Sequence, residues 1–472
     1  MVKMEKMVRI KNQFALLLLV LLSTIAQGQS STILPFTSAV PQSVVYRPSL
    51  FSEHKRFFGI PFLSNTNIQW TNSALNYTGA HTLTDTGAYL DLNVLLRDIK
   101  PINTLAVESD IEFLSFGFGG TKDFFSFNMT HRSTTLFRFT DDFINLLYQG
   151  NGLYVGESVD LSKNSLQASH FMEIGFGYNR KFNEKWSAGI RVKRLLGIDN
   201  VSTDFSQLTA TTAPDDYTLL LNSNAVVNTS SVWLNDNDNQ PSGSFGSISR
   251  YLFSSGNGGW ALNAGVSFVP SDRWTVTFDA LDFGKITWKN SPANYRLQDG
   301  EYTFSGIGLE QLINDNADSD DYLDSLGNTF NVQETNTKYT TQLNGKLMLT
   351  GQYRIAEGTY GILALRSMMV AEEMIPSAVL MVRKDLGRRF TIAANYSRQY
   401  NSINAIGAGV YLRLGTFNFF VSSDNLPGTI FPLDSRTSQV SFGLSVSQLR
   451  AIKKPKQKKQ ENQENKDVIE RY

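Results

Sequence analysis

The sequence has 472 residues, 43 basic and 43 acidic side chains, four histidines and no cysteine. A formal net charge of zero argues against a nucleic-acid partner, because proteins that bind nucleic acid are usually strongly basic. The absence of cysteine excludes disulfide bonds and makes a structural zinc site unexpected.

The first segment has the features of a secretory signal peptide. Basic residues precede an apolar run from Phe14 to Leu22, and Ala26-Gln27-Gly28 offers a small-x-small cleavage site. We expect residues 1–28 to be removed. No other stretch approaches the roughly eighteen consecutive apolar residues of a transmembrane helix. If this exported chain spans a membrane, it should do so with strands that close into a barrel, which leaves no unpaired edge in lipid.

Residues 29–66 form the next segment, which is irregular. Prolines at Pro35, Pro41 and Pro48 interrupt it, which predicts an extended segment without regular structure. Ahead of a barrel, this segment either fills the lumen as a plug or lies in the periplasm. The first plausible strand covers residues 67–76, and we place the barrel at residues 67–447.

The clearest strand pattern runs from Leu166 to Ile198. Apolar and polar residues alternate for about thirteen positions, and the alternation restarts at Trp186 after a polar turn. Globular strands usually end after about five or six residues, whereas a tilted strand that crosses a bilayer needs roughly nine to eleven. The pattern favours a transmembrane hairpin; the alternative is one sheet of a large soluble β-sandwich.

Further hairpins bring the expected number of strands to about fourteen. Short turns alternate with longer connections, so all short turns fall on one side, with both termini on that side, the periplasm. A short helix is predicted between an N-cap at Thr140 and a C-cap at Gly150. The polar residues 448–472 form either a periplasmic docking segment or a solvated tail. The longer connections are expected at residues 132–165, 203–257, 289–341 and 425–436.

Charged residues on the predicted lumen-facing sides of the strands are the candidate binding residues. Because both signs are present, internal ion pairs or a hydrated path are expected rather than an ion filter of one sign. The five candidates are Glu173, Arg191, Lys193, Asp279 and Arg354.

No catalytic or metal-binding motif stands out. His131 and Ser133 share one strand face, but a nucleophile and base also need an orienting group and an oxyanion site. The four histidines lack metal-ligand spacing. We therefore expect no enzyme activity, no cofactor and no metal site. Two acidic clusters in the long loops are expected to be solvated rather than to bind calcium: Asp236 with Asp238, and Asp318 with Asp320 and Asp321.

Residues 280–309 contain a recognisable pattern. Asp282, Gly284 and Trp288 lie on a predicted strand whose alternation slips after Ala280, which indicates a bulge. The last strands contribute to the same resemblance. Over residues 30–450 the sequence resembles an outer-membrane barrel family that is known mainly from Bacteroidetes and is described as a domain of unknown function. The resemblance implies a barrel of fourteen or so strands, similar in shape to the long-chain fatty-acid transporter family and, more distantly, to barrels of type IX secretion and gliding. It supplies no catalytic residue, so the three residues are expected to form a bulge and an interfacial girdle.

The sequence thus predicts an all-β fold, an antiparallel transmembrane β-barrel in the bacterial outer membrane that contacts lipid and lipopolysaccharide. Two functions remain open. One is a channel or transporter for small apolar molecules, which an apolar pocket under the N-terminal segment would support. The other is a non-enzymatic accessory or scaffold of a secretion or surface-attachment system, which a stable periplasmic or secretion-system protein partner would support.

Overall fold

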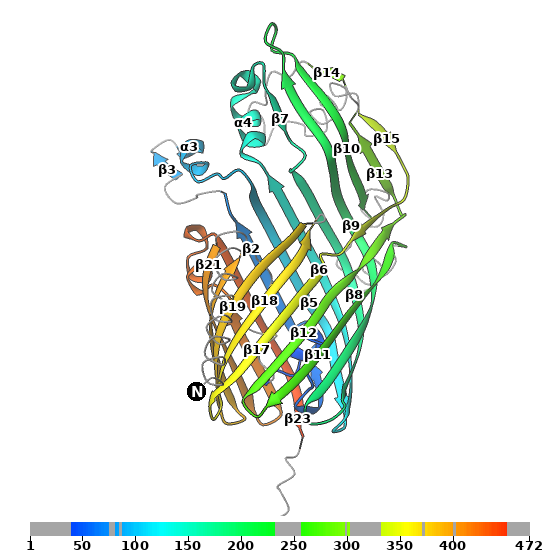
Figure 1. The fold of residues 1–472 in the computed structure, drawn as a ribbon, viewed down its shortest axis with the longest axis vertical. Helices are drawn as coiled ribbons and strands as arrows, with labels where there is room; N and C mark the ends of the chain where they lie inside the picture. Colours follow the sequence, from blue (N-terminus) through cyan, green and yellow to red (C-terminus); the bar gives the residue numbers. More distant parts are fainter. Residues whose placement is uncertain are drawn as a thin grey trace, which may run out of the picture.

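A computed structural model describes residues 39–74, 81–84, 87–231, 256–297, 300–302, 332–370, 373–399 and 403–450. Within these residues the chain forms a closed antiparallel barrel of fourteen strands, which confirms the predicted fold class (Figure 1). Two short strands, β1 (His54–Gly59) and β2 (Asn65–Asn72), share one position in the wall. They pair with β5 (Asn103–Gly119) on one side and with β23 (Thr437–Leu449) on the other, which closes the ring.

The other barrel strands follow one another around the wall in sequence order. They are β6 (Asp123–Phe139), β8 (Ser165–Lys181), β9 (Trp186–Thr212), β11 (Gly258–Ser271), β12 (Trp274–Trp288), β17 (Lys346–Ala356), β18 (Thr359–Val370), β19 (Glu373–Leu386), β20 (Phe390–Gln399), β21 (Ile403–Leu414) and β22 (Phe417–Ser423). The remaining elements are α2 (Ser43–Tyr46), β3 (His81–Thr84), β4 (Gly87–Leu90), α3 (Leu92–Leu95), α4 (Asp141–Gln149), η2 (Asn151–Tyr154), β7 (Ser158–Asp160), β10 (Leu219–Ser231), β13 (Pro292–Arg296), β14 (Gly300–Tyr302), β15 (Gln333–Thr335), β16 (Tyr339–Gln342), α8 (Leu426–Ile430) and η3 (Pro432–Asp434).

The outer wall of the barrel is apolar, as a membrane-spanning barrel requires. In β12, Val276 and Phe278 are exposed on the outside, while the intervening Thr277 is buried toward the lumen. Aromatic residues lie where strands meet the short turns. There, Trp186 stacks on Phe268 of the neighbouring strand with 4.3 Å between ring centroids. Tryptophan suits a membrane interface because it combines an apolar ring with a polar N–H.

Short turns close one end of the barrel, the lower end in Figure 1, as the sequence predicts. Glycines Gly358, Gly387 and Gly415 in three of these turns have φ values of 63°, 70° and 64°. This left-handed region carries no steric penalty for glycine. Because His54 of β1 pairs with Leu449 of β23, the first and last barrel strands start and end at that same end.

The barrel sheet itself continues beyond the upper end of the barrel, and we call this extension the upper sheet. β9 is 27 residues long, and its upper half pairs with β10, which in turn pairs with β13 and β14. The strand therefore does not end near Ile198, and residues 203–257 do not form the long loop that was expected; the β-like piece expected within that loop at residues 217–227 overlaps β10. The polar residues of upper β9 remain extended because β10 completes their hydrogen-bond ladder. Beside this sheet lies α4, capped by Thr140 and Gly150 as predicted.

The described part of the N-terminal segment, residues 39–52, lies inside the lower half of the barrel (Figure 1). The wall begins at His54, thirteen residues before the predicted start at residue 67. β2 overlaps the strand predicted at residues 67–76, whereas β1 was not predicted, because its inner face packs on this segment instead of facing water. For example, Val44 packs against Phe57 of β1 and Phe124 of β6.

Several expectations lie outside the described residues: the signal peptide at 1–28, the acidic clusters of the long loops, and residues 451–472 of the tail. Among the described residues, no helix has the length and apolar character needed to cross a membrane.

Candidate functional site in the lumen

A bulge in β12 turns a carboxylate into the lumen. β12 pairs with β11 in one register up to Ala280 and in a shifted register from Phe283, so Leu281 and Asp282 together face Asn263. Asp282 adopts a φ of 61°, a left-handed conformation that aspartate tolerates better than most residues. Its backbone N–H donates to Oδ1 of Asn263 at 2.7 Å. This is the bulge that the slip after Ala280 predicts.

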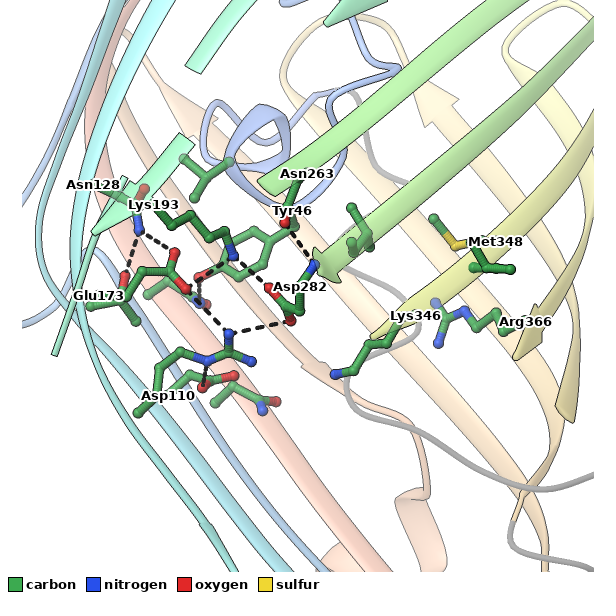
Figure 2. A pocket seen from close by; sticks show the side chains of 17 residues that line it. Tyr46, Asp110, Asn128, Glu173, Lys193, Asn263, Asp282, Lys346, Met348 and Arg366 are labelled. Carbon is green, nitrogen blue, oxygen red and sulfur yellow. Dashed lines mark hydrogen bonds and ion pairs between the residues drawn. The ribbon is translucent and has the colours of Figure 1, made fainter. Parts of the chain in front are cut away.

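Asp282 belongs to a group of five ion-paired side chains, which we call the lumenal cluster (Figure 2). Lys193 Nζ lies 2.6 Å from Asp282 Oδ1 and 3.0 Å from Glu173 Oε2. Arg132 Nη1 lies 3.2 Å from the same Glu173 oxygen and 3.3 Å from Asp282 Oδ2. Arg132 Nε contacts Asp110 at 3.0 Å, directly across the β5–β6 ladder.

The lumenal cluster is largely shielded from water, because its side chains are only 5% to 16% exposed. Charges removed from water are costly unless they are fully paired and hydrogen-bonded. Three carboxylates meet two cations within the cluster. On the facing wall of the same cavity, Lys346 and Arg366 add two more cations (Figure 2). This arrangement suits a ligand with a charged or dipolar group.

Three cavities with shared lining residues lie between the N-terminal segment and the upper part of the barrel. A central cavity of about 100 Å³ lies between the cluster and α2. A second cavity of about 50 Å³ shares Arg132, Asp282 and Lys346 with the first. A third cavity of about 350 Å³ shares Gln167 and Leu343 with the second. The central cavity also has an apolar side, formed by Val45, Leu281, Leu347 and Met348.

Asp279 holds the N-terminal segment below the central cavity. Its buried carboxylate accepts hydrogen bonds from Arg47 Nε at 3.2 Å, from the Ser49 N–H at 2.8 Å and from the Ser49 hydroxyl at 2.7 Å. Burial lowers the pKa of the Arg47 guanidinium from its ordinary value, and the charge of Asp279 opposes this shift. Asn179 Nδ2 also donates to the carbonyl of Pro48 at 2.6 Å. Residues 39–52 therefore occupy the lumen as a side-chain-anchored segment.

The predicted lumenal residues separate into three groups. Glu173 and Lys193 belong to the lumenal cluster, and Arg191 is buried on the same strand as Lys193. Asp279 instead anchors the N-terminal segment. Arg354 joins neither group, because it lies exposed near the end of β17, beside a short turn.

Sequence reasoning missed Arg132, Asp110 and Arg47. His131 lies on the outward face of β6, whereas the next residue, Arg132, points inward. Strict alternation along β6 places Arg132 on the lumenal face, and the acidic Asp110 on the preceding strand would then have indicated its ion-pair partner. Arg47 lies in an irregular segment without periodicity, so no sequence signal indicates its partner.

Trp288 does not lie in an interfacial girdle, contrary to expectation. It is 0% exposed, its Nε1–H donates to Thr341 Oγ1 at 2.8 Å, and its ring stacks on Tyr339. The bulge at Asp282 reverses the alternation of upper β12 and thereby turns Trp288 inward. Gly284 has a packing role, since a Cβ atom there would lie 2.3 Å from the carbonyl oxygen of Trp260.

The pairing considered for His131 and Ser133 is not found. Nε2 of His131 instead contacts Nε2 of His170 on β8. Within the described ranges, no group of three or more histidine, aspartate or glutamate side chains is placed to hold a metal ion.

Comparisons with known proteins place the chain in a family. A family model described as "Family of unknown function (DUF5723)" matches residues 48–424. No curated protein matches the sequence. Among solved structures, the chain is similar to the toluene transporter TodX of Pseudomonas putida, with 8% identity, a TM-score of 0.40, and coverage of 90% of this chain and 98% of TodX.

Two further solved structures are similar at the same level. A FadL homologue of Pseudomonas aeruginosa has 11% identity and a TM-score of 0.39, with coverage of 86% of this chain and 94% of the homologue. The translocator domain of the autotransporter NalP from Neisseria meningitidis has 8% identity and a TM-score of 0.32, with coverage of 87% and 93%. With all three TM-scores below 0.5, these likenesses carry no argument about what the chain binds.

Proposed function

The chain belongs to the family of unknown function DUF5723, and from its geometry we propose that it is an outer-membrane channel for small, largely apolar molecules that carry a polar group. A closed antiparallel ring, an apolar outer wall and short turns at one end are the features of bacterial outer-membrane barrels. In this orientation the short turns face the periplasm, and the upper sheet faces outward, beside the lipopolysaccharide.

The observation that carries the proposal is the series of cavities that leads down to the N-terminal segment. Each cavity shares lining residues with the next, from the third cavity through the second to the central one. A barrel without a transport role could fill its lumen with packed side chains, as small barrels do. Here the space ends at α2, whose Val45 and Tyr46 form the floor of the central cavity.

The walls of this path indicate the chemical class of the ligand. Phe171, Leu343 and Met368 contribute apolar surface to the second cavity beside Arg132 and Asp282. The central cavity combines an apolar side with the lumenal cluster, so it is not the purely apolar pocket that would have supported transport of a wholly apolar molecule. An apolar body would contact the apolar side, and a polar group would replace water at the ion-paired side chains.

The third cavity reaches the outer wall of the barrel. It is lined by Gln167, which faces the lumen, and by Phe283 and Met369, which are 39% and 37% exposed on the outer wall. At this point β12 changes its partner from β17, which pairs up to Leu281, to β16, which pairs from Lys285. An apolar ligand could enter there from the outer leaflet without crossing water.

Native mass spectrometry of the protein extracted from its own membranes in mild detergent tests this proposal. We expect a retained amphipathic small molecule at one per chain, and its loss in an Arg132→Ala variant that still folds. The matched control is Arg354→Ala, because that arginine lies outside all three cavities. Absence of any bound small molecule in repeated preparations, with the cavities occupied by water alone, would contradict the proposal.

The second candidate, a scaffold in a secretion or surface-attachment system, is favoured by the sheet above the barrel. This sheet has its own apolar core, in which Leu146 of α4 packs with Val159, Ala210 and Leu219. Such a structure presents a large surface that a channel does not need. A stoichiometric protein partner in the same mass spectra, lost on deletion of residues 453–472, would support this alternative against the channel.

A further inference from the structure

Two of the four histidines meet on the outer face of the barrel, away from the lumen. His131 on β6 and His170 on β8 are diagonal neighbours, because His131 pairs with Met172 and His170 with Ser133. Their Nε2 atoms face each other in direct contact, with the rings nearly perpendicular at 87°. Both side chains are partly exposed. His170 lies opposite Asp199, where β9 has left its pairing with β11 and pairs with β10, so the histidines lie at the upper rim of the barrel.

Each ring is held in place by a neighbour on its far side. Nδ1 of His170 lies 3.1 Å from Oδ2 of Asp199, and the Ser231 hydroxyl donates to the other oxygen of that carboxylate at 2.6 Å. Phe113 stacks in parallel on the ring of His131, at 5.9 Å between centroids. With the proton of His170 on Nδ1 facing Asp199, its Nε2 lone pair points toward His131.

We propose that this histidine pair binds a late transition-metal ion such as Zn²⁺ or Cu²⁺. Imidazole nitrogens are preferred ligands of these ions, and a ligating histidine usually donates its other N–H to a carboxylate, as His170 does to Asp199. In the metal-free protein, the Nε2–H of His131 donates a hydrogen bond to Nε2 of His170. When the ion takes the place of that proton, His131 takes up a proton from the solvent at Nδ1, so both imidazoles remain neutral and no net proton is released.

The geometry needs only a small adjustment. Two nitrogens bound to one tetrahedral ion at about 2.0–2.1 Å each lie roughly 3.3 Å apart. Small rotations of two partly exposed rings provide this separation. Two imidazoles leave coordination positions for water, which agrees with the absence of a three-ligand group among the described residues.

The test uses the full mature chain in detergent, purified without a histidine tag, because such a tag binds the same ions. Zn²⁺ and Cu²⁺ are titrated by equilibrium dialysis, and the Cu²⁺ form is examined by electron paramagnetic resonance. We expect one ion per chain and a copper spectrum split by two nitrogens. His131→Gln or His170→Gln should weaken binding at least tenfold, and Asp199→Asn by roughly 10–100-fold, as for other carboxylates that support a metal-bound histidine.

The matched control is His81→Gln, since His81 belongs to the separate β3–β4 hairpin. This variant should bind the ion as the wild type does. Gel electrophoresis of heated and unheated samples checks that each variant forms the barrel. The proposal is overturned if the wild type binds less than one ion per chain, if its copper spectrum shows fewer than two nitrogens, or if a folded double histidine variant retains the affinity.

Discussion

Lys193 and Asp282 form a 2.6 Å ion pair although their strands are not neighbours in the wall. β11 lies between them and pairs with both β9 and β12. The lysine therefore spans over β11 inside the lumen and reaches a carboxylate that only the bulge presents. β9 and β12 are thus connected in two ways: through the hydrogen-bond ladders that each forms with β11, and through the Lys193–Asp282 ion pair.

The Lys193–Asp282 contact should contribute strongly to stability. Asp282→Asn leaves Lys193 with Glu173 as its remaining ion-pair partner in a site where the lysine is 6% exposed. Breaking a buried ion pair usually costs about 3–5 kcal/mol. We expect the free energy of unfolding, measured by urea titration in lipid vesicles with tryptophan fluorescence, to fall by about this amount. Asp123→Asn is the control, because its pair with Arg180 is exposed and such pairs contribute about 0–1 kcal/mol.

A second variant separates the effect of the backbone conformation at the bulge on stability from the effect of the charge. Asp282→Ala removes the carboxylate like Asp282→Asn, but alanine tolerates the left-handed φ of 61° less well. The free energy of unfolding of the alanine variant should therefore be lower than that of the asparagine variant by roughly 1 kcal/mol. Equal stabilities in the same urea titration would show that the φ value imposes no cost.

Arg47→Ala should open the lumen. The variant removes one donor from the buried Asp279 and the strongest charge contact of residues 39–52 with the wall. A buried carboxylate without its cation is destabilising, so the segment should leave the lumen more often. Planar-bilayer recordings should show a several-fold rise in open events over the wild type. Arg354→Ala should leave the recordings unchanged; a closed Arg47→Ala channel would refute the anchoring role.

Trp288 should be far more important for stability than the tryptophans of the outer wall. Replacement of a fully buried tryptophan by alanine typically costs about 3–5 kcal/mol, and Trp288 has no exposed surface. Trp186, which is 44% exposed, is the matched comparison and should cost markedly less. Urea titrations of the two alanine variants, followed by circular dichroism, measure the difference. Similar losses in both would contradict the interior placement of Trp288.

The wall could be predicted from the sequence because period-two alternation is a local property. The hairpin over residues 166–198 was predicted from alternation alone, and β8 and β9 cover these residues. The bulge after Ala280 was also visible, as a change of phase. The lumenal side of Glu173 and Lys193 followed from the same rule.

What could not be predicted depends on contacts between distant segments. Arg47 meets Asp279, 232 residues away, and nothing in the irregular N-terminal sequence encodes that partner. Likewise, the meeting of His131 and His170 depends on the register between β6 and β8, which sequence spacing does not reveal. Trp288 was misplaced because its orientation depends on carrying the bulge through the rest of β12.

β9 has a mechanical consequence. At about 3.4 Å per residue, its 27 residues form a continuous strand of roughly 90 Å, with one end in the barrel wall and the other in the upper sheet. Lys193 lies on the half of this strand that belongs to the barrel wall, and the ladder to β10 occupies the other half. A force on the upper sheet would therefore be transmitted along β9 to the strand segment that carries Lys193. The upper sheet is thus mechanically coupled to the lumenal cluster.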